Sequence, residues 1–543
     1  MDLRHELISL GYNHWRGQSD TEVILNAYAQ WGLEGLKKLE GIFSLALWDS
    51  AQQRLILMRD RLGIKPLFYG KCKYGLAFGS EIKAVLASGG VDTSLDEQAF
   101  SEYLWYGNSY GERTFYKGVH ALKPGHWLIF ENGSQFIDKW WSVEDWLEDH
   151  PFSCDASEAA LLTRDAVDAA VNRQLVADVP IGLFLSGGVD SSTIAASAIH
   201  SGSVPLQSFA AGFDYEYGVN ELPKAAQVAS YLGLNHQELV ISGTDLRSVL
   251  YRLADAHDEP FADAANIPLF LMCDQLQSKV KVVLQGDGGD ELFAGYRRYS
   301  LLRNSKFWRL FPKILAKSFR SFSSSGRRLA RIAETVGHHD PSYRMAFLLT
   351  VETQYSPPDR LFCSDFQQHL CENTNPFQEY QNAAKRFAHF DPVSQMMLTD
   401  LVLQLPSQFL TKVDRAFMAA SVEARVPLLD EGVLRLALNL PSHLKVSRFG
   451  KKLPLRGSQR NRLPSQILDG PKTGFGVPYS QWLRTSLFDF CCEHILDPSF
   501  TSRFSLDESL VEDLLQDHKR APGGNGFLLW KLLQLSLWSS LKR

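Results

Sequence analysis

The sequence has few of the features that mark a secreted or membrane protein. Its seven cysteines are an odd number without CxxC spacing, which argues against a disulfide framework or a zinc knuckle. No apolar run is long enough to cross a bilayer. Residues 1–6 are charged where a signal peptide needs its apolar stretch. The sequence therefore predicts a cytoplasmic protein with no membrane partner.

An excess of charge of one sign is also missing. The 56 basic and 61 acidic residues give a net charge of -5, so nucleic acid is not an expected partner of the whole chain. Hydrophobic residues make up 45% and charged residues 22%, which excludes collagen, a coiled coil and wholesale disorder. The 543 residues leave room for two large domains or roughly three to four smaller ones.

Short apolar strands dominate the first part of the chain. Strands are expected at residues 41–48, 54–58, 67–69 and 74–78. Because tight turns join them, they predict an antiparallel layer that is buried on at least one face. Helices are expected at residues 3–10, 22–28 and 82–87. No strand precedes the first helix, so the predicted sheet looks incomplete.

Strands alternate with helices after residue 157. Apolar strands are expected at residues 181–185, 206–213, 236–241 and 280–284, and residues 300–543 are largely helical. This alternation predicts a doubly wound parallel sheet covered on both faces. The predicted fold class is therefore α/β with two domains. They are residues 1–145 and 157–543, joined by a linker of polar and small residues at 146–156.

The segment Ser186–Ser192 joins an apolar strand to an alanine-rich helix. Its two glycines let the backbone approach an anion closely, and the N–H groups of the turn and helix start point toward that anion. Asp190 is unexpected beside a phosphate unless it holds a cation, which indicates Mg²⁺. The lack of a Gly-Lys-Ser/Thr sequence excludes a Walker A loop. A plain turn with a serine N-cap is the structural alternative.

A second loop, Gly286–Glu291, follows directly after the predicted strand that ends at Leu284. In a doubly wound sheet, ligands lie beyond the carboxyl ends of the strands, so both loops are expected to face one cleft. Three carboxylates among glycines suit a magnesium site and one acid–base group. Taken alone, this loop is better explained as an acidic turn that starts a helix. Its pairing with Ser186–Ser192 favours the site.

Two further charged segments allow both a structural and a functional interpretation. Four charges lie among apolar residues: Asp414, Arg415, Glu423 and Arg425. They must be paired if buried, so a structural ion-pair network and a wall of the substrate site stay open as alternatives. In Gly450–Arg456 a lysine could reach a phosphate-bearing cleft, although such a run is more often a solvated surface.

Together these segments resemble the glutamine-dependent asparagine synthetase family, class B type, over essentially the whole chain. Its glutaminase domain is resembled by Ser19–Val23, Gly41–Ala46, Arg59–Leu67 and Phe78–Lys83. Its synthetase domain is resembled by Ser186–Ser192, Gly286–Tyr296, Lys412–Arg415 and Glu423–Pro427. The resemblance implies a truncated type 2 amidotransferase domain of the Ntn αββα kind at 1–145. It also implies an ATP-pyrophosphatase-type synthetase domain at 157–543.

The resemblance implies a ligase of asparagine biosynthesis with small-molecule substrates. ATP and Mg²⁺ activate the aspartate side chain as an aspartyl-adenylate and release pyrophosphate. Ammonia then attacks the acyl carbon, which gives asparagine and AMP. In the family, the glutaminase domain makes this ammonia from glutamine and passes it through an internal tunnel. The resemblance also allows a homodimer, although the sequence itself does not give the oligomeric state.

The resemblance further implies roles for individual residues. Pyrophosphate would be held by Ser186, Gly187, Gly188, Asp190 and Ser191, with Phe184 and Gly286 near the nucleotide. Mg²⁺ would be bound by Asp190 and Asp290. Lys452 would stabilise charge in the adenylating transition state, and Asp287 would accept a proton from the attacking ammonia. Asp20 would bind the amino group of glutamine.

The chain departs from the family pattern near its N-terminus. The family nucleophile is a cysteine at the mature N-terminus, followed by strands, an arginine and an Asn-Gly pair that bind glutamine. None of these is present here, so we expect this chain to use ammonia rather than glutamine. We expect a start upstream of Met1 rather than a degraded domain, because Asp20 and the apolar strands are intact.

Two other functions fit the same motifs. An amidotransferase of the same build could act on another carboxylate, such as a cell-surface sugar acid or a small metabolite. Residues 471–478 and Trp482 support this, because they resemble a family branch with less certain substrates. A non-catalytic nucleotide-binding remnant is the third alternative. Four intact residues argue against it: Asp190, Asp287, Asp290 and Lys452.

Overall fold

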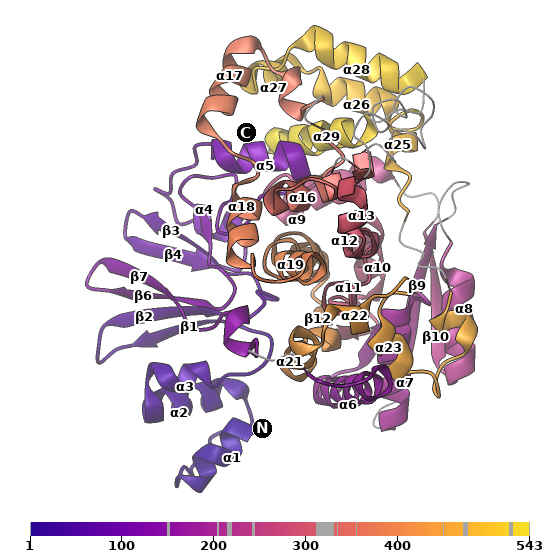
Figure 1. Ribbon diagram of the computed structural model, residues 1–543. Helices are drawn as coiled ribbons and strands as arrows, with labels where there is room; N and C mark the ends of the chain where they lie inside the picture. The colour runs from indigo at the N-terminus through magenta and orange to yellow at the C-terminus, as the bar shows by residue number, and fades with distance from the viewer. Residues whose placement is uncertain are drawn as a thin grey trace.

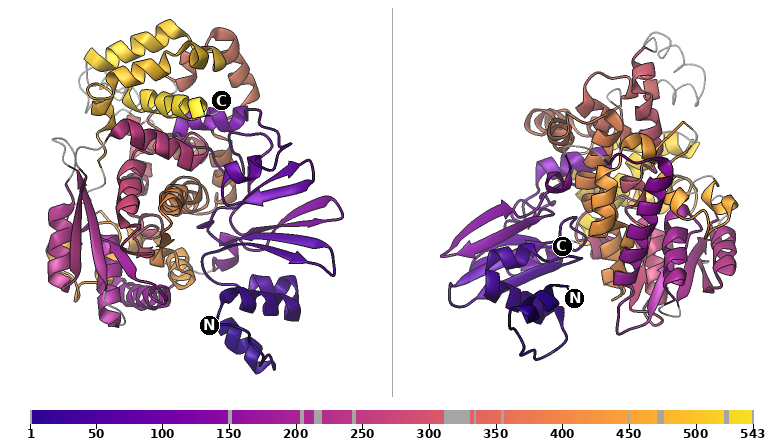
Figure 2. Two further views of the ribbon diagram at one scale, coloured as in Figure 1. Left: turned by 180° about the vertical axis from the view of Figure 1, so that it is seen from behind. Right: turned by 60° about the horizontal axis from the view of Figure 1, so that its bottom comes forward.

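A computed structural model describes most of the chain. The described residues are 2–148, 152–202, 206–213, 220–241, 245–310, 331–333, 335–353, 356–448, 450–470, 476–520 and 525–541. Residues 149–151 of the expected linker and 471–475 of the segment 471–478 lie outside this set. The N-terminal sheets and the parallel sheet lie on opposite sides of a central group of helices (Figure 1), and both views in Figure 2 agree on this arrangement.

Two antiparallel sheets form the N-terminal part, as the sequence predicts. The first sheet has the order β1-β2-β6-β7, with bounds Ser44–Asp49, Arg54–Arg59, His126–Glu131 and Ser134–Lys139. The second has the order β4-β3-β5, with bounds Gly75–Gly79, Phe68–Cys72 and His120–Ala121. Strand side chains alternate between the two faces of a sheet. Leu57 and Leu128 of the first sheet therefore share one face, and they pack with Leu67 and Tyr69 at the second sheet.

Helices cover the other face of the first sheet. These are α2 (Asp20–Trp31) and α3 (Leu33–Lys37), with α1 (Asp2–Ser9) beside α2. Ile56 and Met58 are buried on this face in the same cluster as Leu36 of α3. The N-terminal part also contains α4 (Ile82–Leu86), α5 (Glu97–Tyr106) and the 3-10 helix η1 (Val143–Trp146).

The third sheet, which lies in the C-terminal part, is parallel throughout. Its order is β10-β9-β8-β11-β12, with bounds Asn235–Ile241, Gln207–Phe213, Ile181–Phe184, Val282–Leu284 and Glu423–Arg425. One face packs on α6 (Ala156–Gln174), α7 (Val189–Ser201) and α8 (Leu222–Leu232). The other packs on α9 (Leu246–His257), α10 (Asn266–Leu276) and α20 (Thr411–Ala419). The sheet is thus covered on both faces, which confirms the predicted doubly wound architecture.

The strand order reverses between β8 and β11. The chain passes from β8 to β9 and β10 on one side, and then returns to place β11 on the other side of β8. Such a reversal is the topological switch point at which doubly wound folds bind their ligands. The two predicted loops both begin here, because Val282, Val283 and Leu284 pair with Ile181, Gly182 and Leu183.

The fifth strand, β12, is a short strand within residues 300–543, which are largely helical as predicted. Its three residues pair with β11, and the Glu423 N–H donates to the Lys281 carbonyl at 2.8 Å. Only Ala424 is buried among the three. Because the other two residues are charged and lie at the sheet edge, the segment lacks the apolar pattern of a buried strand.

Helices make up most of the remaining chain. Before residue 400 they are α11 (Gly289–Leu292), α12 (Arg297–Arg303), α13 (Ser305–Leu310), α16 (Pro341–Leu348), η2 (Pro358–Leu361), α17 (Ser364–Asn373), α18 (Gln378–Arg386) and α19 (Pro392–Thr399). From residue 400 they are the π-helix η3 (Asp400–Leu410), η4 (Pro427–Leu429), α21 (Glu431–Asn439), α22 (Ser442–Lys445), α23 (Leu453–Ser458), α24 (Ser465–Leu468), α25 (Tyr479–Trp482), α26 (Phe488–Ile495), α27 (Pro498–Arg503), α28 (Glu508–Arg520) and α29 (Gly526–Leu541).

Helix α29 is buried against the N-terminal part, where it lies beside α5 (Figure 1). The ring of Phe100 on α5 stacks on Phe504, with 5.5 Å between ring centroids. Lys531 of α29 is completely buried, and its ammonium donates to the Leu104 carbonyl and to Glu352 Oε1 at 2.9 Å. Among the described residues, no helix is both long and apolar enough to cross a membrane.

Replacing Lys531 by Met should destabilise this contact between the two parts. The substitution leaves the carboxylate of Glu352 buried without its cation, so we expect the free energy of unfolding to fall by about 3 to 5 kcal/mol. Urea unfolding measures the change. Lys385→Met is the control, because Lys385 is exposed on α18 and should cost less than about 0.5 kcal/mol. Equal midpoints for the two variants would contradict this account of the buried pair.

Candidate active site

The loop after β8 folds back onto the start of α7. Gly187 has a φ of +70°, and a Cβ there would lie 2.6 Å from the Cβ of Lys224, so glycine is required. The Ser186 N–H donates to Ser191 Oγ at 3.2 Å, and the Gly188 N–H donates to Ser186 Oγ at 3.3 Å. Gly188 is the N-cap of α7. This geometry places backbone N–H groups and serine hydroxyls at the positive end of a helix dipole.

The loop after β11 lies directly against the first loop. A Cβ at Gly286 would be 2.9 Å from Asp190 Cβ and 3.0 Å from the Ser191 nitrogen. A Cβ at Gly289 would be 2.6 Å from Asp190 Cγ. The glycines of the second motif therefore allow the two strand ends to approach one another. They bring Asp290, on α11, close to Asp190, on α7.

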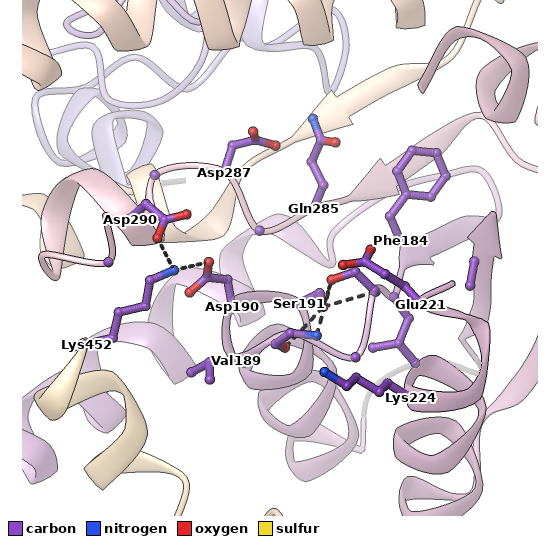
Figure 3. A pocket seen from close by; sticks show the side chains of 18 of the residues that line it. Phe184, Val189, Asp190, Ser191, Glu221, Lys224, Gln285, Asp287, Asp290 and Lys452 are labelled. Carbon is purple, nitrogen blue, oxygen red and sulfur yellow. Dashed lines mark hydrogen bonds and ion pairs between the residues drawn. The ribbon is translucent and has the colours of Figure 1, made fainter. Parts of the chain in front are cut away.

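Lys452 joins the two loops from a distant part of the sequence. Its ammonium contacts Asp190 Oδ2 and lies 2.8 Å from Asp290 Oδ1 (Figure 3). The residue has a φ of +55° at the N-cap of α23, and its N–H donates to the Phe293 carbonyl at 3.1 Å. Only 5% of it is exposed. Burial opposes the charge, but Asp190 and Asp290 outweigh it and raise the pKa of Lys452, so the side chain is a cation.

All the residues predicted for the synthetase site line one cavity of about 400 Å³. They are Phe184, Ser186, Gly187, Gly188, Asp190, Ser191, Gly286, Asp287, Asp290 and Lys452. The labelled ones come from both strand ends and from the start of α23 (Figure 3). The structure thus brings together residues that lie far apart in the sequence, at the switch point where a ligand is expected.

Asp287 lies on the cavity wall formed by the loop after β11. Burial raises its pKa to about 6. The positive charge of Lys412 acts against this rise, while the carboxylates of Asp190 and Asp290 add to it. A carboxylate with a pKa near neutrality is suited to proton transfer, because both of its protonation states are accessible.

Two family models match the chain. Residues 162–540 match the model for asparagine synthase, and residues 1–141 match the model for a glutamine amidotransferase domain. The chain belongs to the asparagine synthase family. This confirms the family resemblance found from the motifs. The protein is therefore a carbon–nitrogen ligase that uses ATP for amidation and carries a glutamine amidotransferase domain.

Curated relatives match over most of their length. A putative asparagine synthetase (glutamine-hydrolyzing) of Mycobacterium tuberculosis is 31% identical, covering 100% of this chain and 82% of the relative. Asparagine synthetase (glutamine-hydrolyzing) 1 of Bacillus subtilis is 28% identical, covering 100% of this chain and 84% of the relative. A protein named amidase chyE of Penicillium rubens is 34% identical, covering 86% of this chain and 74% of the relative.

The residues of the cavity fit ATP and Mg²⁺ in this family. The N–H groups at the start of α7 and the Lys452 ammonium suit a triphosphate. The carboxylates of Asp190 and Asp290 both contact the Lys452 ammonium, so they lie close together. Mg²⁺ is typically held by one or two carboxylates together with phosphate oxygens. Within the described ranges, no group of three or more His, Cys, Asp or Glu side chains could hold a metal. Nucleotide oxygens would complete the coordination of Mg²⁺, as is typical of this ion.

The four charges that lie among apolar residues form ion pairs, and none of them lines the cavity: Asp414, Arg415, Glu423 and Arg425. Asp414 pairs with Lys65 at 3.4 Å, and Arg415 lies 3.6 Å from Glu81. Both pairs connect α20 with the N-terminal part. On the same helix, Lys412 lines the cavity. Helix α20 is therefore an ion-pair bridge on one side and a cavity wall on the other.

Asp20 is placed away from this cavity, at the start of α2 in the N-terminal part. Its carboxylate accepts a hydrogen bond from the Thr21 N–H at 2.8 Å. Three lysines that line the cavity, Lys224, Lys412 and Lys451, are not among the predicted site residues. Lys412 stands in the segment Lys412–Arg415, which carries the family resemblance, but no role is predicted for it there. The sequence around Lys224 contains no motif that indicates a site. Its spatial neighbour Gly187 is separated from it in the sequence by α7 and β9.

Replacing Gly295 by Ala should disrupt the nucleotide site. A Cβ at this position would overlap both Asp290 Oδ1 and Lys452 Cε, so one of the two must move. We expect the affinity for ATP with Mg²⁺ to fall at least about tenfold, because the displaced groups carry charges. Calorimetric titration measures the affinity. Gly432→Ala is the control, since its added Cβ would have its nearest neighbours at 3.5 Å. Unchanged affinity in Gly295→Ala would argue against these two side chains as nucleotide ligands.

Proposed function

We propose that the protein amidates the side-chain carboxylate of aspartate to give asparagine, AMP and pyrophosphate. The observation that carries the proposal is the convergence of Lys452, Asp190 and Asp290 at the switch point of the sheet. The triphosphate would lie on the N–H groups of the loop after β8. The aspartate carboxylate would attack the α-phosphate, so that a phosphorus–oxygen bond forms and pyrophosphate leaves.

In this mechanism the polar side chains predicted from the sequence have defined tasks. Asp190 and Asp290 would hold Mg²⁺, which neutralises phosphate charge when bound. The ammonium of Lys452 would stabilise the negative charge that develops as pyrophosphate departs. Ammonia would then attack the acyl carbon and displace AMP, and ionised Asp287 would accept the proton that the nitrogen loses.

We propose that the protein with this sequence uses free ammonia as its nitrogen donor. Cys72 is the single cysteine among residues 1–145. It is half-buried at the end of β3, where it pairs with Gly75 in the neighbouring strand. A cysteine at that place in a sheet does not match the N-terminal nucleophile of the family pattern. Comparing ammonium and glutamine as donors tests this part of the proposal.

A different carboxylic acid is the second candidate acceptor. It is favoured by the relative named amidase chyE, which is 34% identical and whose name does not refer to asparagine. An acceptor panel distinguishes the two candidates. The panel contains aspartate, small dicarboxylates and sugar acids, and pyrophosphate release from ATP is measured with each. Release with a sugar acid but not with aspartate would replace the first candidate by the second.

Lys452→Met should abolish aspartate-dependent formation of AMP and pyrophosphate. The loss of the ammonium removes stabilisation of the transition state, so we expect the rate to fall by at least about 100-fold. Lys281→Met is the matched control, because Lys281 is exposed just before β11, does not line the cavity, and its ammonium donates to the Gln277 carbonyl. Thermal midpoints of both variants confirm folding. A folded Lys452→Met variant with full activity would refute the role of this lysine.

The amidation rate should fall as the pH drops through about 6. The raised pKa of Asp287 means that the carboxylate is ionised above about pH 6 and protonated, hence unable to accept a proton, below it. The rate is measured from pH 5 to 8 at constant free ammonia. Asp287→Asn should be slower by about 100-fold and should lack this pH limb. The same limb in Asp287→Asn would assign the titration to another group.

A further inference from the structure

A second buried cation lies on a different wall of the cavity from the phosphate loop. Lys412 is in the first turn of α20 and lines the cavity, with 13% of its side chain exposed. Its ammonium donates to Asp263 Oδ2 at 3.1 Å. Burying a lysine is costly, and one ion pair offsets only part of that cost. The mechanism proposed above leaves Lys412 without a task.

The position of Lys412 is fixed by Asp263. The other carboxylate oxygen of Asp263 accepts a hydrogen bond from the Ala265 N–H at 3.0 Å. The backbone carbonyl of Asp263 accepts one from the Asn266 N–H at 3.0 Å. These bonds anchor the carboxylate at the start of α10, which packs directly against α20. Ala265 also lines the cavity. The ammonium of Lys412 is therefore held in one place beside the open space.

Lys412 is near the reacting end of the cavity. Its positive charge acts on Asp287, the group assigned to the proton of the attacking nitrogen. Burial opposes the charge of Lys412, but Asp263 and Asp287 together raise its pKa, so it is a cation. The triphosphate side already has Lys452, Lys224 and the N-terminus of α7. A further fixed cation on the Asp287 side suits an anionic group of the acceptor.

We propose that Lys412, positioned by Asp263, binds the second carboxylate of the acceptor, which is the carboxylate that ATP does not activate. The acceptor is then a short dicarboxylate, activated at one end and held at the other. This inference rests on the proposed function and assigns a specificity residue to it. A site that contains a buried charge discriminates strongly against an analogue that leaves the charge unpaired.

Aspartate and 3-aminopropanoate test the proposal, because they differ only by the carboxylate that Lys412 would bind. In the wild type, kcat/KM for pyrophosphate release should be about 100-fold higher with aspartate. In Lys412→Met, the value for aspartate should fall by about that factor, while the value for 3-aminopropanoate stays within about threefold. Lys412→Arg keeps the charge and should retain most of the preference. An equal loss with both acceptors would overturn the proposal.

Asp263→Asn examines the positioning role separately. It should raise KM for aspartate several-fold with little change in kcat, and it should leave KM for 3-aminopropanoate unchanged. Calorimetric titration with aspartate in the presence of a non-hydrolysable ATP analogue gives a second readout. We expect Lys412→Met to lose measurable binding of aspartate. Unchanged affinity for the ATP analogue shows that the variants are folded. Undiminished aspartate binding in Lys412→Met would refute the assignment.

Failure of the proposed function gives a different result. If the wild type releases pyrophosphate with sugar acids and not with aspartate, the acceptor itself is wrong, and the inference falls with it. If the wild type uses aspartate and Lys412→Met retains the preference for aspartate over 3-aminopropanoate, only the inference is refuted.

Discussion

The site depends on one ion triad around a buried lysine. Lys452 lies between two aspartates that follow neighbouring parallel strands, and none of the three charges would be stable there alone. The triad requires close approach of the two loops, which only glycine permits at Gly286 and Gly289. The fold supplies the remaining condition, because the strand order reverses between β8 and β11. Chemistry and topology therefore coincide at one place in the chain.

The sequence predicts the parts of the site that are local. Ser186–Ser192 and Gly286–Glu291 each carry glycines and charged groups in a short segment after an apolar strand. Their roles could be proposed from residue types alone. Strand β8 could also be predicted locally, because its apolar pattern is continuous. The order of strands then determines that the two loops meet.

Other parts could not be predicted from local pattern. Lys452 stands in a charged run that is typical of a solvated surface, and its partner Asp190 is 262 residues away. Only the family resemblance indicated it. β12 was missed because two of its three residues are charged, and a short edge strand needs no apolar run. Lys412 was overlooked because its buried environment comes from α10, which the motif around it does not contain.

The two parts of the chain are joined by more than a linker. Phe100 and Lys531 place α5 and α29 in one core, and Lys65 and Glu81 contact Asp414 and Arg415 across the boundary. Contacts of this kind restrict relative movement of domains, because buried charges lose their partners when the surfaces separate.

Helix α20 takes part in both systems at once. Lys412 faces the larger cavity, while Asp414 and Arg415 line a second cavity of about 60 Å³ against the N-terminal part. Because a helix moves as a rigid rod, rotation or sliding of α20 would alter the walls of both compartments together.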